Sequence, residues 1–271
     1  MSSIDSPTRA IWVERHGAVA RLVLDRPAAG GAPLNVLDLE TIRELNARLG
    51  EALGDESVRL VEIRGRKSFS AGVEIRDHFP ERAPEMLLEF HTLVRSVLYA
   101  RCPTVAVVRG YCLGGGMELA CACDFIVASK EAQFGQPEIK VGCFPPVAAV
   151  LLPRLIPEKR AMEMILIGEP ISGEEAYRLG LVNRLAESAS LDEEVEKFAS
   201  ALLNQSSAVL TLARKASRLG SREEFESALR ESERIYLEEL LKLEDATDGL
   251  RAFLEKRPPA WRQGGMGAGK G

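Results

Sequence analysis

The stretch TVAVVRGYCLGGGMELA, residues 104–120, decides the expected fold of this chain. Its first seven residues form an almost continuous apolar run, which predicts a buried strand. Gly114, Gly115 and Gly116 come after this strand, and the run MELACAC that follows them predicts a helix. The first N–H groups of a helix have no internal partner, and glycines let a ligand oxygen approach them closely. The stretch therefore predicts a main-chain site for an oxygen that develops negative charge.

The sequence before and after this stretch alternates between strand and helix patterns. Further strands are expected at 10–17, 18–27, 58–65 and 125–129, and helices at 38–53 and 85–100. The first two strands meet at His16-Gly17 and predict an antiparallel hairpin, and Asp38 is a suitable helix N-cap. Strands that read as continuous apolar runs between helices imply a mainly parallel sheet covered on both faces.

Helical patterns dominate beyond residue 145. They are expected at 146–156, 158–168, 173–181, 191–205, 207–219 and 223–243, with a short apolar stretch at 181–185. The amphipathic helices after 190 suit packing against the core and packing against a neighbouring subunit equally well. The glycine-rich end is expected to be disordered.

Composition excludes several classes of protein. The chain has 271 residues, 46% of them hydrophobic, and a formal net charge of −5, which suits one large domain and argues against a surface that binds polyanions throughout. The sequence contains no run of about 18 apolar residues, so no membrane span is predicted. The N-terminus does not resemble a secretory signal. The five cysteines lie mostly in apolar sequence, which favours reduced, buried thiols in a cytoplasmic protein. Cys121 and Cys123 lack a second pair of ligands, so no metal site is expected.

Two glutamates stand close to the glycine segment. Glu118 lies in the first turn of the predicted helix, and Glu138 follows a proline in QFGQPEI, residues 133–139. Taken alone, each is better explained by an ordinary structural role: Glu118 complements the helix dipole, and Glu138 is an exposed loop residue. Two carboxyl groups that converge on one water would form a general acid/base pair, and their proximity would raise one pKa. The sequence alone does not show that they converge.

Three segments together resemble the enoyl-CoA hydratase/isomerase (crotonase) superfamily, over a span from about residue 10 to 262. They are KSFSAGVEI (67–75), GYCLGGGMELA (110–120) and QFGQPEI (133–139), and Glu138 follows Glu118 by 20 positions, as in the hydratases. The resemblance implies an α/β fold: a crotonase-like spiral of ββα units with a helical C-terminal part. It implies a core over 1–195, a helical trimerisation part over 196–262 and a disordered tail over 263–271.

The same resemblance implies roles for individual residues. The backbone N–H groups of Val73 and Gly115 would form an oxyanion hole for a thioester oxygen, with Glu118 and Glu138 around the attacking water. One such donor is worth roughly 3–4 kcal/mol. CoA is part of the substrate, so no separate cofactor is expected. The expected partners are an acyl-CoA and further copies of the chain, as a trimer or a dimer of trimers, without nucleic acid or membrane.

Contacts to CoA follow from the resemblance less directly. Leu34 and Val36 fall in the loop that lines the adenine pocket, and Ala71 lies in the first oxyanion loop. Arg76 would meet the nucleotide phosphates, and Lys256 and Arg257 resemble residues that reach a neighbour's CoA. Ordinary solvated surface cations explain Arg76 and Lys256 equally well.

One departure from the typical hydratase pattern bears on the acyl group. CFPPV, residues 143–147, replaces a glycine-rich turn, and Phe144 and Pro145 are expected to stiffen the acyl pocket around a cyclic group. With SAGVEI and the Asp77-His78 pair, this segment resembles the cyclohexa-1,5-diene-1-carbonyl-CoA hydratases. Such an enzyme would form 6-hydroxycyclohex-1-ene-1-carbonyl-CoA in anaerobic benzoyl-CoA degradation. The alternatives are a straight-chain trans-2-enoyl-CoA hydratase, a double-bond isomerase and a non-catalytic crotonase-like binding protein.

Overall fold

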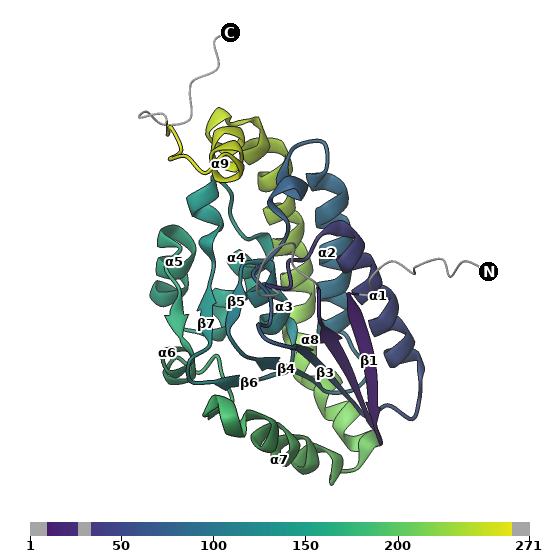
Figure 1. The fold of residues 1–271 in the computed structure, drawn as a ribbon. Helices are drawn as coiled ribbons and strands as arrows, with labels where there is room; N and C mark the ends of the chain where they lie inside the picture. Colours follow the sequence, from purple (N-terminus) through teal and green to yellow (C-terminus); the bar gives the residue numbers. More distant parts are fainter. Residues whose placement is uncertain (1–9, 27–33, 262–271) are drawn as a thin grey trace, which may run out of the picture.

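A six-stranded sheet, in the order β1-β2-β3-β4-β6-β9, forms the centre of the molecule (Figure 1). The computed structural model describes residues 10–26 and 34–261. The strands of this sheet are β1 (Ile11–His16), β2 (Val19–Leu24), β3 (Leu60–Gly65), β4 (Thr104–Val108), β6 (Phe125–Ser129) and β9 (Arg184–Ala186). β1 pairs antiparallel with β2, and each later pair of neighbours is parallel. The expected hairpin and the mainly parallel sheet are both confirmed.

A second, three-stranded sheet was not expected from the sequence. It consists of β5 (Tyr111–Leu113), β7 (Gln133–Gly135) and β8 (Ile171–Ser172), and β5 runs parallel to β7. The apolar run had suggested that the glycines follow β4, but in the structure they follow β5. The N–H of Gly114 donates to the carbonyl of Gly135 at 2.9 Å. This pairing holds the glycine turn beside the segment that carries Glu138.

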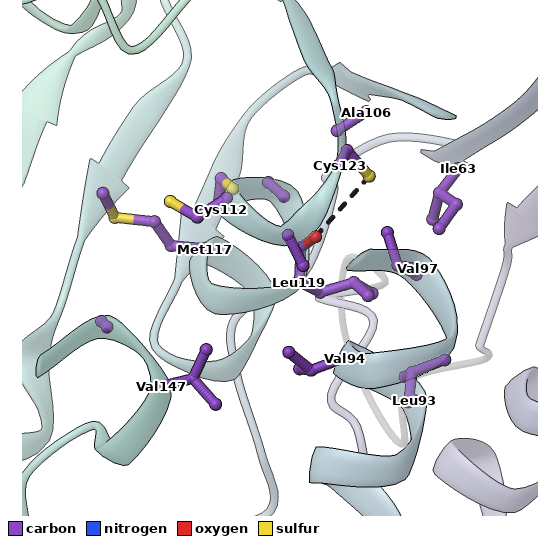
Figure 2. Close-up of a cluster of buried hydrophobic side chains, with 14 of the residues drawn as sticks. Ile63, Leu93, Val94, Val97, Ala106, Cys112, Met117, Leu119, Cys123 and Val147 are labelled. Carbon is purple, nitrogen blue, oxygen red and sulfur yellow. Dashed lines mark hydrogen bonds between the residues drawn. The ribbon is translucent and has the colours of Figure 1, made fainter. Parts of the chain in front are cut away.

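Both faces of the large sheet are covered, which explains why its strands read as continuous apolar runs. Val105 and Val107 on β4 pack toward α7, while Ala106 and Val108 belong to the main core on the opposite face. Figure 2 shows part of that core, where Leu119 of α3 lies beside Val94 and Val97 of α2, and Met117 extends from α3 in the direction away from α2. All five cysteines are buried and free.

The helices agree with the sequence patterns except near the C-terminus. They are α1 (Leu39–Gly54), α2 (Ala83–Leu98), α3 (Gly115–Ala122), α4 (Pro146–Leu155), α5 (Glu158–Ile167), α6 (Gly173–Arg178), α7 (Leu191–Leu203), α8 (Ser207–Arg234) and α9 (Glu244–Leu254). Asp38 caps α1 as expected, accepting from the N–H of Thr41 at 2.9 Å. The patterns at 207–219 and 223–243 gave two helices. The structure instead joins them in α8, which continues as a π-helical turn over Ile235–Glu239.

The C-terminal helices pack on the core of their own chain. α8 lies against α4, where Ser232 Oγ donates to the carbonyl of Pro146 at 3.1 Å. α9, which the sequence analysis missed, covers one end of the molecule and contacts η1 (Ile75–His78) and η2 (Pro137–Val141) (Figure 1). The expected boundary after residue 195 falls inside α7. The expected tail over 263–271 lies outside the described residues. Within 10–26 and 34–261, no helix is long and apolar enough to cross a bilayer.

Candidate active site

Two loops meet at the glycine turn before α3. Ser70 pairs with this segment, since its N–H donates to the Tyr111 carbonyl and its carbonyl accepts from the Leu113 N–H, both at 2.9 Å. Gly72 has φ +104, and a Cβ there would lie 3.1 Å from the Leu113 carbonyl oxygen and 3.6 Å from the Gly115 nitrogen. The close approach of the two backbones therefore depends on glycine at 72.

This approach places the main-chain donors of Val73 and Gly115 on the two sides of one turn. Val73 Cγ2 lies 2.7 Å from the position that a Cβ on Gly115 would occupy. Within the described residues, neither of these two N–H groups has an acceptor. Gly115 is the first residue of α3, so its N–H also carries the positive end of the helix dipole. The pair has the chemistry of an oxyanion hole.

The carboxyl group of Glu118 is hydrogen-bonded to the N-terminus of a different helix, α4. Its Oε1 accepts from the N–H groups of Val147 and Ala148, both at 2.8 Å, in the first turn of α4. The side chain is only 3% exposed. Burial raises the pKa of Glu118 to about 7, although the two N–H donors act in the opposite direction.

Glu138 approaches the same glycine turn from η2. A Cβ on Gly114 would lie 2.5 Å from Glu138 Oε1, and Gly114 itself has φ +51. Only glycine therefore leaves room for this carboxyl group. Burial, followed by the negative charge of Glu118, raises the pKa of Glu138 well above its ordinary value. Two carboxyl groups from distant parts of the sequence thus interact across one turn, and at least one favours its protonated form near neutral pH.

The buried side chain of Gln136 also contacts Glu138. With its amide nitrogen facing the carboxyl group, Gln136 donates to Oε1 and Oε2 at 3.3 and 3.2 Å. Sequence analysis missed this contact, although Gln136 stands only two positions before Glu138.

A cavity of about 510 Å³ opens beside Val73, Gly114 and Glu138, whereas Glu118 and Gly115 are not part of its lining. Its lining includes four residues that the sequence analysis assigned to substrate or oxyanion binding, and also Glu138. The four are Leu34, Val36, Ala71 and Val73. The wall also includes His78 of η1 and Arg257, which follows α9, and the sequence had drawn attention to both. Lys140 and Val141 of η2, and Gly249 and Phe253 of α9, were not expected there.

The cavity lining does not include the other four predicted contact residues. Arg76 has a side chain 72% exposed, with Glu74 at 3.9 Å, and Lys256 is exposed while its neighbour Arg257 faces the cavity. Phe144 packs edge-on against Tyr236, with 5.3 Å between ring centroids. Pro145 is the N-cap residue of α4. The CFPPV segment therefore supports the helix end that holds Glu118 and does not form the cavity wall.

These features together are suited to adding water to a conjugated thioester. The paired carboxyl groups can exchange protons with water, and the paired N–H groups can stabilise an enolate oxygen. Among the residues that the structure describes, no cluster of histidine, cysteine or carboxylate side chains has the arrangement of a metal site.

Comparison with known proteins agrees with this chemistry. The profile of the enoyl-CoA hydratase/isomerase family matches residues 14–264. The cyclohexa-1,5-dienecarbonyl-CoA hydratase of Thauera aromatica is 37% identical, over 96% of this chain and 99% of that protein. A carnitinyl-CoA dehydratase of Escherichia coli O157:H7 is 32% identical, over 94% of this chain and 99% of that protein. The crystal structure of an enoyl-CoA hydratase from Mycobacterium avium subsp. paratuberculosis superimposes with a TM-score of 0.84 at 29% identity, covering 95% of this chain and all of the other. This chain therefore belongs to the enoyl-CoA hydratase/isomerase family.

Proposed function

We propose that this acyl-CoA hydratase adds water to cyclohexa-1,5-diene-1-carbonyl-CoA and forms 6-hydroxycyclohex-1-ene-1-carbonyl-CoA. The observation that carries the hydration chemistry is the approach of Glu118 and Glu138 to one glycine turn, beside two N–H groups that have no acceptor among the residues the structure describes. The ring substrate is supported by the similarity to the Thauera hydratase along almost the whole of both chains. The corresponding role is in the anaerobic degradation of aromatic compounds.

In the proposed reaction, the oxygen of water bonds to the ring carbon β to the thioester as a carboxylate accepts its proton. The π electrons move toward the thioester oxygen, where the N–H groups of Val73 and Gly115 stabilise the enolate. The second double bond extends this enolate, so a proton returns to its far end and not to Cα. Glu118 and Glu138 jointly supply and accept these protons, and the site is restored after each turnover.

CoA enters this proposal as part of the substrate, and the steps above need no separate cofactor. Leu34, Val36 and Ala71 would contact the CoA moiety, and their position in the cavity wall supports this role. Arg76 and Lys256 do not line the cavity of their own chain, so in this proposal they would contact the part of CoA that extends beyond it. We further propose a cytoplasmic enzyme that assembles as a trimer or a dimer of trimers.

Two substrates distinguish the proposal from its alternatives. Purified protein is incubated with the cyclic dienoyl-CoA and, separately, with crotonyl-CoA, and the loss of ultraviolet absorbance from conjugation is followed. We expect turnover of the ring substrate. Turnover of crotonyl-CoA alone would identify a straight-chain hydratase, and turnover of neither would favour a binding protein.

The assignment of the two carboxyl groups is tested by substitution. Glu118→Gln and Glu138→Gln each remove one proton-exchanging group and preserve its shape, so we expect turnover to fall at least about a hundredfold. Binding of the CoA ester, measured by calorimetry, should change little. Near-normal turnover in both variants would contradict the assignment.

A further inference from the structure

Three side chains that the proposed hydration does not use are linked beside the cavity. Tyr236, in the π-helical turn after α8, is fully buried, and its hydroxyl lies 2.7 Å from Nδ1 of His78. The Cys143 thiol lies near the same hydroxyl and helps to raise the pKa of Tyr236. π-Helical turns are rare and frequently occur at functional sites. These residues come from three separate parts of the chain, and among them His78 lines the cavity.

The chemistry of the three groups gives the linkage a direction. Burial lowers the pKa of His78 to about 4, so its ring is neutral at pH 7 and carries one N–H. Burial also raises the pKa of Cys143 to about 12 and that of Tyr236 well above its usual value, so both keep their protons. Imidazole nitrogen is a strong acceptor and a thiol sulfur a weak one. Tyr236 therefore donates to Nδ1 of His78 and not to the Cys143 sulfur.

This direction leaves the proton of the His78 ring on Nε2. No described residue forms a hydrogen bond with Nε2, while the His78 side chain is part of the cavity wall. The negative charges of Glu138 and Glu118 contribute to the raised pKa of Tyr236. The linked groups therefore lie near the proposed site of water addition. A neutral N–H donor in this position matches an oxygen acceptor on the acyl group.

We propose that His78 is a specificity-determining residue whose Nε2–H donates to the hydroxyl group that hydration adds to the acyl chain. Tyr236 is a positioning residue, because it acts only by fixing the tautomer and orientation of His78. The inference rests on the proposed function, since it takes the cavity to be the acyl-CoA site. The favoured ligands are CoA esters with an oxygen at the β carbon.

The tautomer is tested by NMR of the protein labelled with ¹⁵N-histidine. The chain has only three histidines, so long-range ¹H–¹⁵N spectra are simple, and His78→Gln assigns the ring of interest. At pH 7 we expect the Nε2–H form for His78. Tyr236→Phe keeps the ring that packs on Phe144 and removes the donor, so a mixture of tautomers should appear. The exposed Tyr177→Phe is the matched control and should leave the spectrum unchanged. An Nδ1–H form in the unsubstituted protein, or no change in Tyr236→Phe, would overturn the proposal.

Ligand recognition is tested by calorimetry in the Glu118→Gln background, which blocks turnover. The probes are cyclohexanecarbonyl-CoA and 2-hydroxycyclohexane-1-carbonyl-CoA, which differ by one hydroxyl group. His78→Leu should weaken binding of the hydroxylated ester about tenfold and that of the other ester less than about twofold. His78→Gln should recover most of the loss, because its amide N–H lies where Nε2–H lies. Equal weakening of both esters would show that His78 only packs against the ligand.

These experiments are separate from the test of the proposed function. If unsubstituted protein fails to hydrate the dienoyl-CoA while the tautomer and the ester preference are as expected, the ring substrate is wrong and the role of His78 stands. If hydration occurs and the ester preference is absent, the role of His78 is wrong and the hydratase assignment stands.

Discussion

Glu118 is held where its charged form is costly. Burial raises its pKa to about 7, whereas the ordinary value is 4.5. Between these values the folded protein binds this proton more tightly than the unfolded chain does. The stability contributed by the protonated carboxyl group is therefore complete below about pH 4.5 and is lost as the pH rises through about 7.

Glu118→Gln should accordingly stabilise the protein more at pH 8 than at pH 4.5. The glutamine oxygen can still accept from Val147 and Ala148, and the neutral amide removes the cost of a buried charge. We expect a relative gain of about 1–3 kcal/mol at the higher pH, measured by denaturant unfolding. The exposed Glu51→Gln serves as the control. An equal effect of Glu118→Gln at both pH values would contradict this account of its titration.

The donor at Gly115 can be removed separately from the space that glycine provides. Proline is tolerated at the first position of a helix, so Gly115→Pro deletes the N–H that faces the oxyanion site without breaking α3. Gly115→Ala adds a Cβ against Val73 and retains the N–H. We expect kcat of the proline variant to fall about a hundredfold to a thousandfold below that of the alanine variant. Equal kcat values in the two variants would exclude Gly115 N–H as a donor in the reaction.

No sequence pattern indicated α9, but in the structure this helix forms part of the cavity wall. A Cβ on Gly249 would lie 2.5 Å from the Val141 carbonyl oxygen. This glycine therefore lets α9 pack tightly on η2, the same short helix that carries Glu138. Phe253 on α9 then completes the cavity wall. The position of α9 thus connects the C-terminal part of the chain to the proposed acyl-CoA site.

Substitution by alanine should lower the stability of the protein at one helical glycine and raise it at another. Gly249→Ala must displace α9, so we expect a lower melting temperature and a raised KM for the CoA ester. Gly50 lies within α1 with no neighbouring atom within 4 Å of an added Cβ, so Gly50→Ala should stabilise by about 0.5–1 kcal/mol and leave KM unchanged. Calorimetric melting and steady-state kinetics compare the two variants. An unchanged KM in Gly249→Ala would show that α9 does not shape the site.

On the scale of the whole molecule, α8 carries apolar side chains that its own chain leaves exposed. Val209, Leu212 and Leu219 are 63%, 65% and 66% exposed. Burial of such residues between subunits is favourable, in agreement with the proposed trimer or dimer of trimers. Light scattering should give three or six times the chain mass of 29.6 kDa, and Leu212→Glu should lower it. A monomer mass for the unsubstituted protein would contradict the proposed assembly.

The sequence predicted the helices and strands that have a regular apolar pattern. It missed the features that depend on contacts between residues far apart in the chain. The strand of Val105 and Val107 was readable because burial on both faces leaves a continuous apolar run. The strands β5 and β7 have three residues each, too few to produce a period. The hold of α4 on Glu118 joins positions 29 and 30 residues apart, and no local pattern records it. The pair of glutamates that we propose as catalytic was found through the resemblance, because each glutamate alone had an ordinary structural explanation.

The grip of α4 on Glu118 also bears on the stereochemistry of the product. Oε1 is occupied by two N–H donors, so a proton on this carboxyl group resides on Oε2. Pro146 has no N–H, which leaves the donors of Val147 and Ala148 to fix the rotation of the carboxyl plane. In the proposed reaction, a carboxyl group fixed in this way would hold the attacking water on one face of the acyl group. The new carbon–oxygen centre should therefore be formed with one handedness.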